Sequence, residues 1–389
     1  TEWDMWSTDP RRYTDYADQD YSDQKAIEVY GHEYAMHFPH HVWPAGRNKK
    51  LSPVHARVIA AGGVMGVYNG WERANWFARA EDDLSHEATQ TWDRNGPWAQ
   101  RVKQECEAVR DNVGVLDLPG FSRFNLSGDG AAEWLRGRIT GALPKIGRMN
   151  LAYFADTRGR ILTEMTIVTG PKSRDLFQSL NTQADLHAPW LSHQMAKVAG
   201  VDCALARVSF AGELGWEIHA ANAHIPDLYA AVVGAGAKPF GMWALNALRM
   251  EKGYRAWKGD LSTDYTLLQG GLDRFVKLDK PQDFPGKAAL LREQQTGPTK
   301  RFVTLVVEAG DQDAPYMSTV SYKGEVIGET TSGDWGYRVS KSIAFAMVRA
   351  DLALAGTKLE VNIFGVTRRA TVQADAPLWD PENKRLRAF

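Results

Sequence analysis

The chain has 389 residues, of which 44% are hydrophobic and 24% are charged, and its formal net charge at pH 7 is -1. This length predicts two or three domains, and the composition is that of a globular protein, not of a disordered or fibrous one. The 46 basic residues are matched by 47 acidic ones, so no basic surface for nucleic acid is expected. No apolar run approaches the roughly eighteen residues of a membrane span. Neither nucleic acid nor a membrane is therefore an expected partner.

Cysteine usage and the first residues bear on the cellular compartment. Cys106 and Cys203 are the two cysteines, which excludes a disulfide framework and argues against a zinc or iron–sulfur site made of cysteines. A reducing compartment is expected, either the cytoplasm or, in a eukaryote, the mitochondrial matrix. Residues 1–23 are polar and acidic, unlike a signal peptide. The chain begins with Thr1, which favours processing or one half of a longer polypeptide.

The N-terminal third predicts an arm followed by helices and one strand. Residues 1–50 are rich in Tyr, Asp, His and Pro and are expected to form an extended arm. Residues 87–111 have roughly helical apolar spacing broken at 95–97, which predicts two short helices. A strand is expected at 122–127, and a short helix is expected after the turn at 128–129.

The rest of the chain mixes strands and helices and then becomes β-rich. A strand is expected at 160–168, a strand pair at 205–220, and helices at 225–233 and 242–252. From about residue 295 the pattern changes to short β-like runs separated by Gly-bearing turns, which predicts a small C-terminal β domain. These runs are 302–307, 342–348, 358–364 and 369–372.

Two common nucleotide-binding patterns are missing from the sequence. No strand is followed by G-x-G-x-x-G, and no G-x-x-x-x-G-K-[ST] loop is present. The chain by itself is therefore not expected to bind a flavin, a nicotinamide or a nucleotide phosphate. The segment Gly234-Ala235-Gly236 follows a predicted helix and is interpreted as its terminator.

The histidines do not predict a metal site. His32 and His37 resemble a zinc-protease pair, but their spacing would place the two imidazoles about 140° apart on a helix. His40 and His41 are neighbours in an extended segment and point apart, so they are expected at a surface or an interface. No metal ligand is assigned.

Three separated stretches carry the strongest functional signal. They are Gly70-Trp71-Glu72-Arg73, the segment 209–219 with Gly212-Glu213-Leu214-Gly215-Trp216-Glu217, and the segment 241–254 with Arg249-Met250-Glu251-Lys252-Gly253-Tyr254. In this order and spacing they resemble the folate-binding aminomethyltransferase family of the glycine-cleavage T-protein, and within it the tetrahydrofolate half of dimethylglycine and sarcosine dehydrogenases. The resemblance runs from about residue 50 to the end. Residues 30–34 also resemble the connector that follows the flavin domain of those dehydrogenases.

The resemblance implies an α+β fold of three domains in a clover-like ring around a channel for the reduced pterin, with a small C-terminal β-barrel domain. The implied domains are a connector arm at 1–50, two α+β folate-binding domains within 51–295, and the C-terminal β-barrel domain at 296–389. The implied cofactor is tetrahydrofolate, with FAD only on a separate or upstream domain. The implied partners are a small methylated amine and a flavin-containing domain or subunit.

The family's folate contacts map onto several residues. A pterin ring presents N–H donors beside a carbonyl, so a carboxylate can accept two hydrogen bonds while flat side chains cover its faces. Glu217 matches the family's pterin-gripping carboxylate, and a solvated strand Glu is the alternative. Phe210 stands where the family usually has a tyrosine, and Phe121 matches an apolar contact for which core packing is the alternative. The further cofactor contacts are assigned to Tyr153, Trp71 and Arg249.

The catalytic acid/base is assigned to Glu164. In the family an Asp on the strand after a Gly-rich turn takes the proton as the folate nitrogen attacks, and Glu164 is the matching residue after the turn at 156–160. It keeps the charge but places the carboxylate about one methylene further out. Leu162 and Thr166 on the same face of the strand are expected to raise its pKa by desolvation. A partly exposed strand Glu is the alternative.

Three functions remain open on the sequence. The first is a tetrahydrofolate-dependent transferase that accepts the one-carbon unit when a flavin partner oxidises an N-methyl amine of the dimethylglycine or sarcosine type, and forms 5,10-methylenetetrahydrofolate. The second is flavin-independent methyl transfer to tetrahydrofolate from a sulfonium, quaternary amine or aryl ether. The third is a non-catalytic folate-binding factor, whose relatives carry Lys-Gly-Cys-Tyr where this chain has Lys252-Gly253-Tyr254. Leu151 and Leu245 replace a family aromatic residue and arginine, which favours the dehydrogenase-linked branch.

Overall fold

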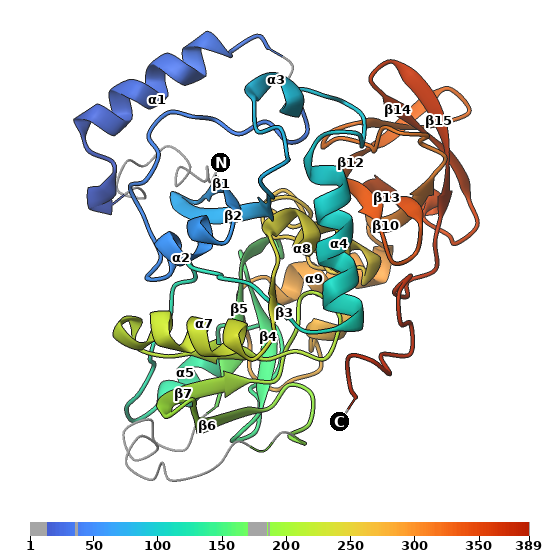
Figure 1. Cartoon of the computed structure of the whole chain (residues 1–389). Helices are drawn as coiled ribbons and strands as arrows, with labels where there is room; N and C mark the ends of the chain where they lie inside the picture. Colours follow the sequence, from blue (N-terminus) through green and yellow to red (C-terminus); the bar gives the residue numbers. More distant parts are fainter. Residues whose placement is uncertain (1–13, 36–37, 170–184, 186, 389) are drawn as a thin grey trace. The chain divides into compact units, whose positions relative to one another are not determined.

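The computed structural model describes residues 14–35, 38–169, 185 and 187–388 (Figure 1). These residues fall into two compact units. The first unit comprises the described residues up to 123 together with 222–244, and the second comprises 124–221 and the chain from 245 onward. None of the described helices is long and apolar enough to cross a membrane.

The first unit contains five helices and two small sheets among its described residues. Strands β1 and β2 pair antiparallel, and β3 and β9 pair parallel. The elements are α1 (Gln19–Gly31), α2 (His55–Ala60), β1 (Gly63–Tyr68), β2 (Trp71–Phe77), α3 (His86–Thr89), α4 (Trp98–Asp111), β3 (Gly114–Val115), a 3-10 turn (Asn222–His224), α7 (Ile225–Gly234) and β9 (Lys238–Pro239). The two helices predicted within 87–111 and the helix predicted at 225–233 are confirmed as α3, α4 and α7.

Helix α1 corrects the prediction of an extended N-terminal arm. Asp18 caps the helix by accepting a hydrogen bond from the backbone N–H of Tyr21 at 2.8 Å, and none of the helix residues is buried. Because the helix has no apolar face, its sequence shows no helical periodicity. The short-range cap was the available signal for this helix.

His40 was expected at a surface or an interface, and the structure places it half-buried among aromatic rings. Its ring lies against the indoles of Trp98 and Trp243, with centroid distances of 4.5 and 4.2 Å. Burial lowers the pKa of His40 to about 4, because the charged imidazolium loses hydration there. His40 is therefore a packing residue of the first unit. His37, which was compared with His32 as a metal pair and rejected, lies outside the described residues.

A buried carboxyl group on α4 ties three segments of the first unit together. Glu105 accepts hydrogen bonds from the backbone N–H groups of Phe77 at 2.7 Å and Gly241 at 2.8 Å. Its helix buries Trp98, Val102, Cys106 and Val109 on the same face. Burial raises the pKa of Glu105 to about 8, although the two backbone donors act in the opposite direction.

Glu105 predicts that the first unit loses stability as the pH rises. The pKa is about 8 in the folded protein against 4.5 in an unperturbed carboxyl, so between these values the folded state binds more protons than the unfolded state. The free energy of unfolding therefore falls with increasing pH in this window. We expect denaturant titrations of the wild type between about pH 5 and pH 8 to show this slope, and the Glu105→Gln variant to show a flatter one. An equally steep profile in the variant would contradict the assignment.

Among its described residues, the second unit contains two small sheets and a barrel. Strands β4 and β5 form one antiparallel pair, and β6, β7 and β8 form a three-stranded sheet. The elements before the barrel are α5 (Ala131–Arg136), β4 (Met149–Ala155), β5 (Ile161–Val168), β6 (His193–Val198), β7 (Val201–Ala206), β8 (Glu217–His219), a 3-10 turn (Asp273–Phe275) and α9 (Lys287–Thr296). Helix α8 (Met242–Glu251) begins in the first unit and continues into the second. The predicted strand at 160–168 and the predicted helix at 242–252 are confirmed.

The predicted strand at 122–127 is absent from the described structure. The structure assigns no strand to these described residues, and Phe124 and Leu126 are 81% and 51% exposed. Polar and apolar residues alternate here as in a half-buried strand, but this pattern forms a strand only where a neighbouring strand is available. The prediction at 205–220 is confirmed in part, because β7 and β8 pair antiparallel there.

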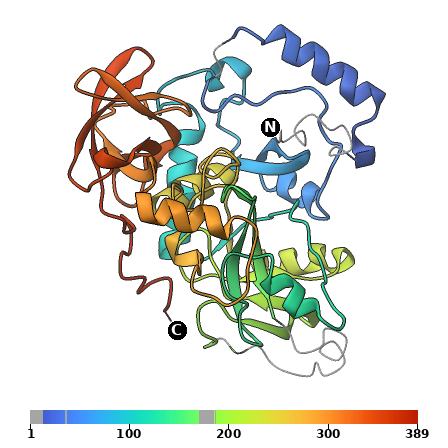
Figure 2. The ribbon, with the colours of Figure 1, turned by 180° about the vertical axis from the view of Figure 1, so that it is seen from behind.

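A closed barrel forms the C-terminal part of the second unit, as predicted, and its strands can be followed in both views (Figures 1 and 2). The strand order is β10-β13-β12-β11-β14-β15, and β15 pairs back with β10. The bounds are β10 (Lys300–Val307), β11 (Thr319–Tyr322), β12 (Glu325–Gly336), β13 (Lys341–Arg349), a 3-10 turn (Ala350–Leu352), β14 (Lys358–Ile363) and β15 (Val366–Val372).

The barrel buries both faces of strand β13. Ala344, Ala346 and Val348 belong to the cluster that fills the barrel. Phe345 and Met347 pack on the other face in a cluster that includes Met250 of α8. Because consecutive residues of a strand point to opposite faces, a continuous apolar run is required where both faces are covered. The barrel is thereby packed against helix α8, which also carries Arg249.

Candidate functional site

Glu164 and Tyr153 lie opposite each other on the β4–β5 pair. The register pairs Tyr153 with Glu164, so their side chains share one face of the ribbon. Tyr153 is 1% exposed and its ring packs on Phe275 with a centroid distance of 5.3 Å. The Tyr153 hydroxyl lies close enough to the Glu164 carboxyl group to lower its pKa. The structure thus brings together two residues that the sequence assigned separately.

Burial raises the pKa of Glu164, while the hydrogen bond from Tyr153 and the charge of Arg255 act to lower it. The side chains expected to cause the desolvation do not do so. Leu162 is 48% exposed and Thr166 is also exposed, whereas Glu164 itself is half-buried. Tyr153 and Arg255, which other segments supply, are the neighbours that act on the carboxyl group against burial. This setting suits a group that takes and releases a proton.

Arg255 is a functional candidate that sequence reasoning missed. Its guanidinium carbon lies 4.1 Å from the centroid of the Phe302 ring, and its Nη2 donates to the carbonyl of Gly271 at 3.4 Å. Its Nε is buried and has no hydrogen-bond partner among the described residues. Burial lowers the pKa of Arg255. The sequence signal was weak, because an arginine in a loop after a helix is usually solvated.

Phe210 and Tyr254 form a second cluster on adjoining segments. Their rings stack with a centroid distance of 5.8 Å and an interplanar angle of 18°, and Phe210 remains 41% exposed. Tyr254 directly precedes Arg255, so this stack and the carboxyl group of Glu164 both border the segment 254–255. An aromatic ring with one covered and one open face can stack on a flat ligand.

Glu217 lies on the edge strand β8 and is 48% exposed. Its carboxylate lies 3.2 Å from Nε2 of His219, and β8 pairs with β7 so that Glu217 is opposite Ala206. The carboxylate is thus accessible to a ligand with N–H donors, and it is not bonded to the Glu164 pair. Its role as the pterin carboxylate stays a prediction.

Arg249 is held by protein groups on both sides of its guanidinium. It pairs with Asp260 at 2.6 Å, donates to Asn246 at 2.8 and 3.0 Å, and donates to Ser332 Oγ at 2.8 Å. Asp260 in turn accepts from Thr331 and Ser332 at 2.6 Å each. These bonds join α8 to barrel strand β12. A direct contact of Arg249 with a cofactor remains a prediction.

Trp71 and Phe121 belong to the first unit. Trp71 lies in β2, and Nζ of Lys50 is 5.3 Å from its ring centroid. Phe121 is 60% exposed, and the guanidinium carbon of Arg73 is 5.5 Å from its ring centroid. Phe121 is therefore not a core residue of that unit, which removes the alternative of core packing there and leaves its ligand contact as a prediction.

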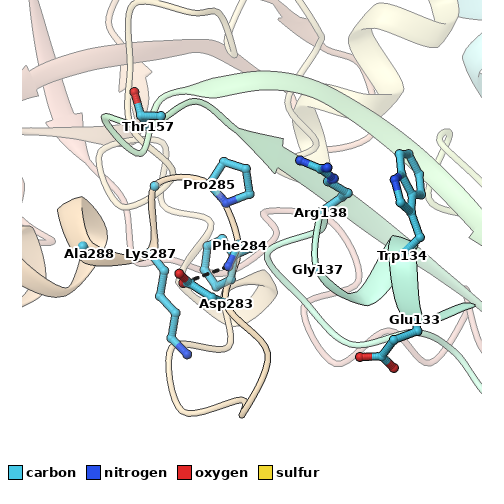
Figure 3. Close-up of a pocket in the computed structure, with 11 residues that line it drawn as sticks. Glu133, Trp134, Gly137, Arg138, Thr157, Asp283, Phe284, Pro285, Lys287 and Ala288 are labelled. Atoms are coloured by element: carbon cyan, nitrogen blue, oxygen red, sulfur yellow. Dashed lines mark hydrogen bonds between the residues drawn. The ribbon is translucent and has the colours of Figure 1, made fainter.

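The second unit also has an open groove of about 640 Å³ between α5 and the start of α9 (Figure 3). Trp134 and Arg138 lie side by side on one wall, and the guanidinium carbon of Arg138 is 5.5 Å from the centroid of the Trp134 ring. None of the predicted site residues lines the groove, so we do not assign it to the candidate site. Its lining is Glu133, Trp134, Gly137, Arg138, Thr157, Asp283, Phe284, Pro285, Gly286, Lys287 and Ala288. The described residues contain no cluster of three metal-ligating side chains.

Family comparisons bear directly on this arrangement. The model of the GCVT N-terminal domain matches residues 54–169 and 165–280, and that of the glycine cleavage T-protein C-terminal barrel domain matches residues 300–380. The chain belongs to the glycine cleavage T-protein family. The predicted resemblance is thereby confirmed. Residues 1–52 match the central domain of FAD dependent oxidoreductases.

Curated relatives of this T-protein family member include dehydrogenases and aminomethyltransferases. Mitochondrial dimethylglycine dehydrogenase of Rattus norvegicus is 30% identical over 439 residues, covering 98% of this chain and 51% of the relative. The 4-methylaminobutanoate oxidase (formaldehyde-forming) of Paenarthrobacter nicotinovorans is 29% identical, covering 99% of this chain and 52% of the relative. An aminomethyltransferase of Synechococcus sp. (strain WH7803) is 34% identical, covering 52% and 55%. The chain spans about half the length of the dehydrogenase and oxidase relatives.

A solved structure shares the fold. The glycine cleavage system aminomethyltransferase T from Bartonella henselae superposes with a TM-score of 0.69 at 19% sequence identity, covering 85% of this chain and 98% of that protein. This likeness, together with the closed six-stranded barrel, confirms the predicted α+β fold of the aminomethyltransferase type with a C-terminal barrel domain.

Proposed function

We propose that this chain is a tetrahydrofolate-dependent one-carbon transferase whose catalytic acid/base is Glu164. The observation that carries the proposal is the half-buried Glu164 carboxyl group, opposite Tyr153 on the β4–β5 pair and close to the charge of Arg255, in a member of the glycine cleavage T-protein family. A proton acceptor of this kind serves an amine that loses its proton as it forms a bond to carbon.

The residues of the second unit fit a reduced folate. The open face of Phe210 offers a stacking surface, and the exposed Glu217 carboxylate offers two acceptors for ring N–H groups. The buried Nε of Arg255 is a donor without a partner among the described residues, which suits a carbonyl or carboxylate oxygen. The ligand's flat ring and its polar edge thus each find a complementary group.

Within this proposal, bound tetrahydrofolate supplies the amine nitrogens that accept the one-carbon unit. Glu164 accepts the proton released at that nitrogen, and burial poises its pKa above that of a solvated Glu. The Tyr153 hydroxyl acts to lower the pKa of that carboxyl group and so offsets part of the effect of burial. Arg255 favours the charged form and so limits how far burial raises that pKa.

The names of the relatives support a substrate class. Dimethylglycine, sarcosine and 4-methylaminobutanoate, which name the related enzymes, are all N-methylated amino acids. We propose that the one-carbon unit comes from oxidation of such an N-methyl amine by a flavin domain, and that 5,10-methylenetetrahydrofolate is the product. The match of residues 1–52 to an FAD dependent oxidoreductase domain supports FAD on another domain or subunit. The mitochondrial relatives favour the matrix in a eukaryote, and the cytoplasm otherwise.

Calorimetric titration with tetrahydrofolate tests the binding step. We expect the wild type to bind and the Glu217→Gln variant to bind about 10- to 100-fold more weakly, because one acceptor becomes an amide donor facing the ring N–H groups. Asp202→Asn is the matched control, since Asp202 is an exposed acid on the adjacent strand β7. Folded wild-type protein that shows no binding would overturn the proposed function. Equal affinity of the Gln variant would overturn the role of Glu217.

The folate product separates the proposal from direct methyl transfer. Chromatography after incubation with tetrahydrofolate and formaldehyde is expected to show 5,10-methylenetetrahydrofolate forming faster than in the uncatalysed reaction, with water as the by-product. Formation of 5-methyltetrahydrofolate from a sulfonium, quaternary amine or aryl ether would instead support the demethylase alternative. Binding without either product would support a non-catalytic folate-binding factor.

A further inference from the structure

The last described residues of the chain lie against the loop that carries Phe210. We call residues 379–388 the C-terminal strap and residues 209–216 the aromatic loop. The strap follows the barrel, and Leu386 within it is 2% exposed. The backbone N–H of Trp379 donates to the carbonyl of Glu251 at 3.0 Å. The strap is therefore packed into the second unit and is not a loose end.

Glu213 is the point where the strap and the aromatic loop meet. Its Oε1 accepts hydrogen bonds from the indole N–H of Trp379 at 2.8 Å and from Arg338 at 2.7 Å. Its Oε2 accepts from Nε of Arg385 at 2.6 Å. Glu213 is 7% exposed, so both of its oxygens are bound by donors in a largely buried site. Two of these three donors belong to the strap.

Two further cations bind the strap to the same loop. Arg207, at 2% exposure, donates to the strap carbonyl of Ala388 at 2.8 Å and to the loop carbonyl of Gly215 at 3.2 Å. Lys252 donates to the carbonyl of Asp380 at 3.0 Å and to Asn383 at 2.9 Å. The stem of Lys252 lies so close to Gly212 that a Cβ there would overlap it. The loop is thus held at three positions between Phe210 and Glu217.

We propose that the C-terminal strap positions the aromatic loop, so that Phe210 and Glu217 are presented to the ligand, with Glu213 as the positioning residue. This inference rests on the proposed function for the identity of the ligand. The match to the C-terminal barrel domain ends at residue 380, so Arg385 and the carbonyl of Ala388 lie outside it. A carboxylate bound on both oxygens is an effective anchor because charge-assisted hydrogen bonds are short and directional.

The test compares two single substitutions within the strap. Arg385→Met removes the bond to Glu213 Oε2, whereas Lys384→Met removes an equal charge from a neighbour that is 78% exposed and pairs with Glu382. Hydrogen exchange reports order in residues 209–217 without any ligand. Steady-state kinetics with tetrahydrofolate and formaldehyde, and calorimetry with tetrahydrofolate, report the binding site.

For Arg385→Met we expect faster exchange in 209–217, unchanged exchange in the barrel strands, and a KM for tetrahydrofolate and a Kd that both rise about three- to tenfold with kcat unchanged. Trp379→Phe, which keeps an aromatic side chain but removes the indole N–H donor to Glu213, is expected to act in the same direction. Lys384→Met should match the wild type. Unchanged exchange in the loop, or faster exchange with unaltered Kd, would overturn the inference. If the wild type binds no folate while the loop loosens in Arg385→Met, the proposed function fails and the ordering of the loop by the strap is upheld.

Discussion

The Glu164→Gln variant is expected to form 5,10-methylenetetrahydrofolate about 10²- to 10⁴-fold more slowly than the wild type, with little change in its affinity for tetrahydrofolate. The amide keeps the shape of the side chain and its contact with Tyr153 but cannot accept the proton from the folate nitrogen. Rates are measured with tetrahydrofolate and formaldehyde after subtraction of the uncatalysed reaction. Affinity is measured by calorimetry on the same preparation.

Matched variants make this result specific. Glu308→Gln makes the same chemical change at an exposed position on the barrel side of the second unit and should leave the rate unchanged. Glu164→Asp keeps the carboxylate and restores the family's residue, so it should retain more activity than the Gln variant. A Gln variant as fast as the wild type would remove Glu164 from the catalytic role.

The same site predicts the direction of a shift in the pH profile. The hydrogen bond from Tyr153 lowers the pKa of Glu164 against the effect of burial. Tyr153→Phe removes this donor, so the carboxyl group should hold its proton to higher pH, and the acidic limb of the rate profile should move to higher pH. The pH dependence of the rate is measured for Tyr153→Phe alongside the Glu164 variants. A purely structural role of Tyr153 would lower the rate without moving the acidic limb of this profile.

The second large effect is expected from Arg338→Met, which should lower the free energy of unfolding of the second unit by about 3–5 kcal/mol. Arg338 donates to Glu213 at 2.7 Å. Its backbone N–H also donates to Oε1 of Glu251, and its Nε donates to Oε2 of the same carboxylate. Its guanidinium also donates to the carbonyl of Leu248 at 2.8 Å. Removing the cation leaves the buried Glu251 carboxyl group without its compensating charge and leaves Glu213 with Arg385 alone.

Denaturant titration followed by circular dichroism measures this loss, and a double-mutant cycle with Glu251→Gln assigns it. Because the two residues interact directly, the double variant should cost less than the sum of the single substitutions. An additive cycle, or a loss below about 1 kcal/mol for Arg338→Met, would show that the pair contributes little.

The sequence identified the elements and residues that follow local patterns. The strand at 160–168 alternates side chains along a two-residue period, and the helices at 225–233 and 242–252 have a helical apolar pattern, so both could be predicted. Once the strand and the turn at 156–160 were placed, Glu164 followed from its position in the family motif. The wrong predictions lie where a local pattern is missing or misleading, as in α1 and in residues 122–127.

The sequence by itself determined the family, the class of fold with its C-terminal barrel, and the candidate acid/base, because these depend on motifs and on periodicities within short segments. Only the tertiary structure showed that Arg255 and Tyr153 surround Glu164, and that Glu213 joins the aromatic loop to Arg338 and Arg385, which lie 125 and 172 positions away. Contacts at such separations depend on how the whole chain is routed through its sheets and barrel. A solvated arginine and one that holds a buried carboxylate look the same in the sequence, and the burial of the partner is what distinguishes them.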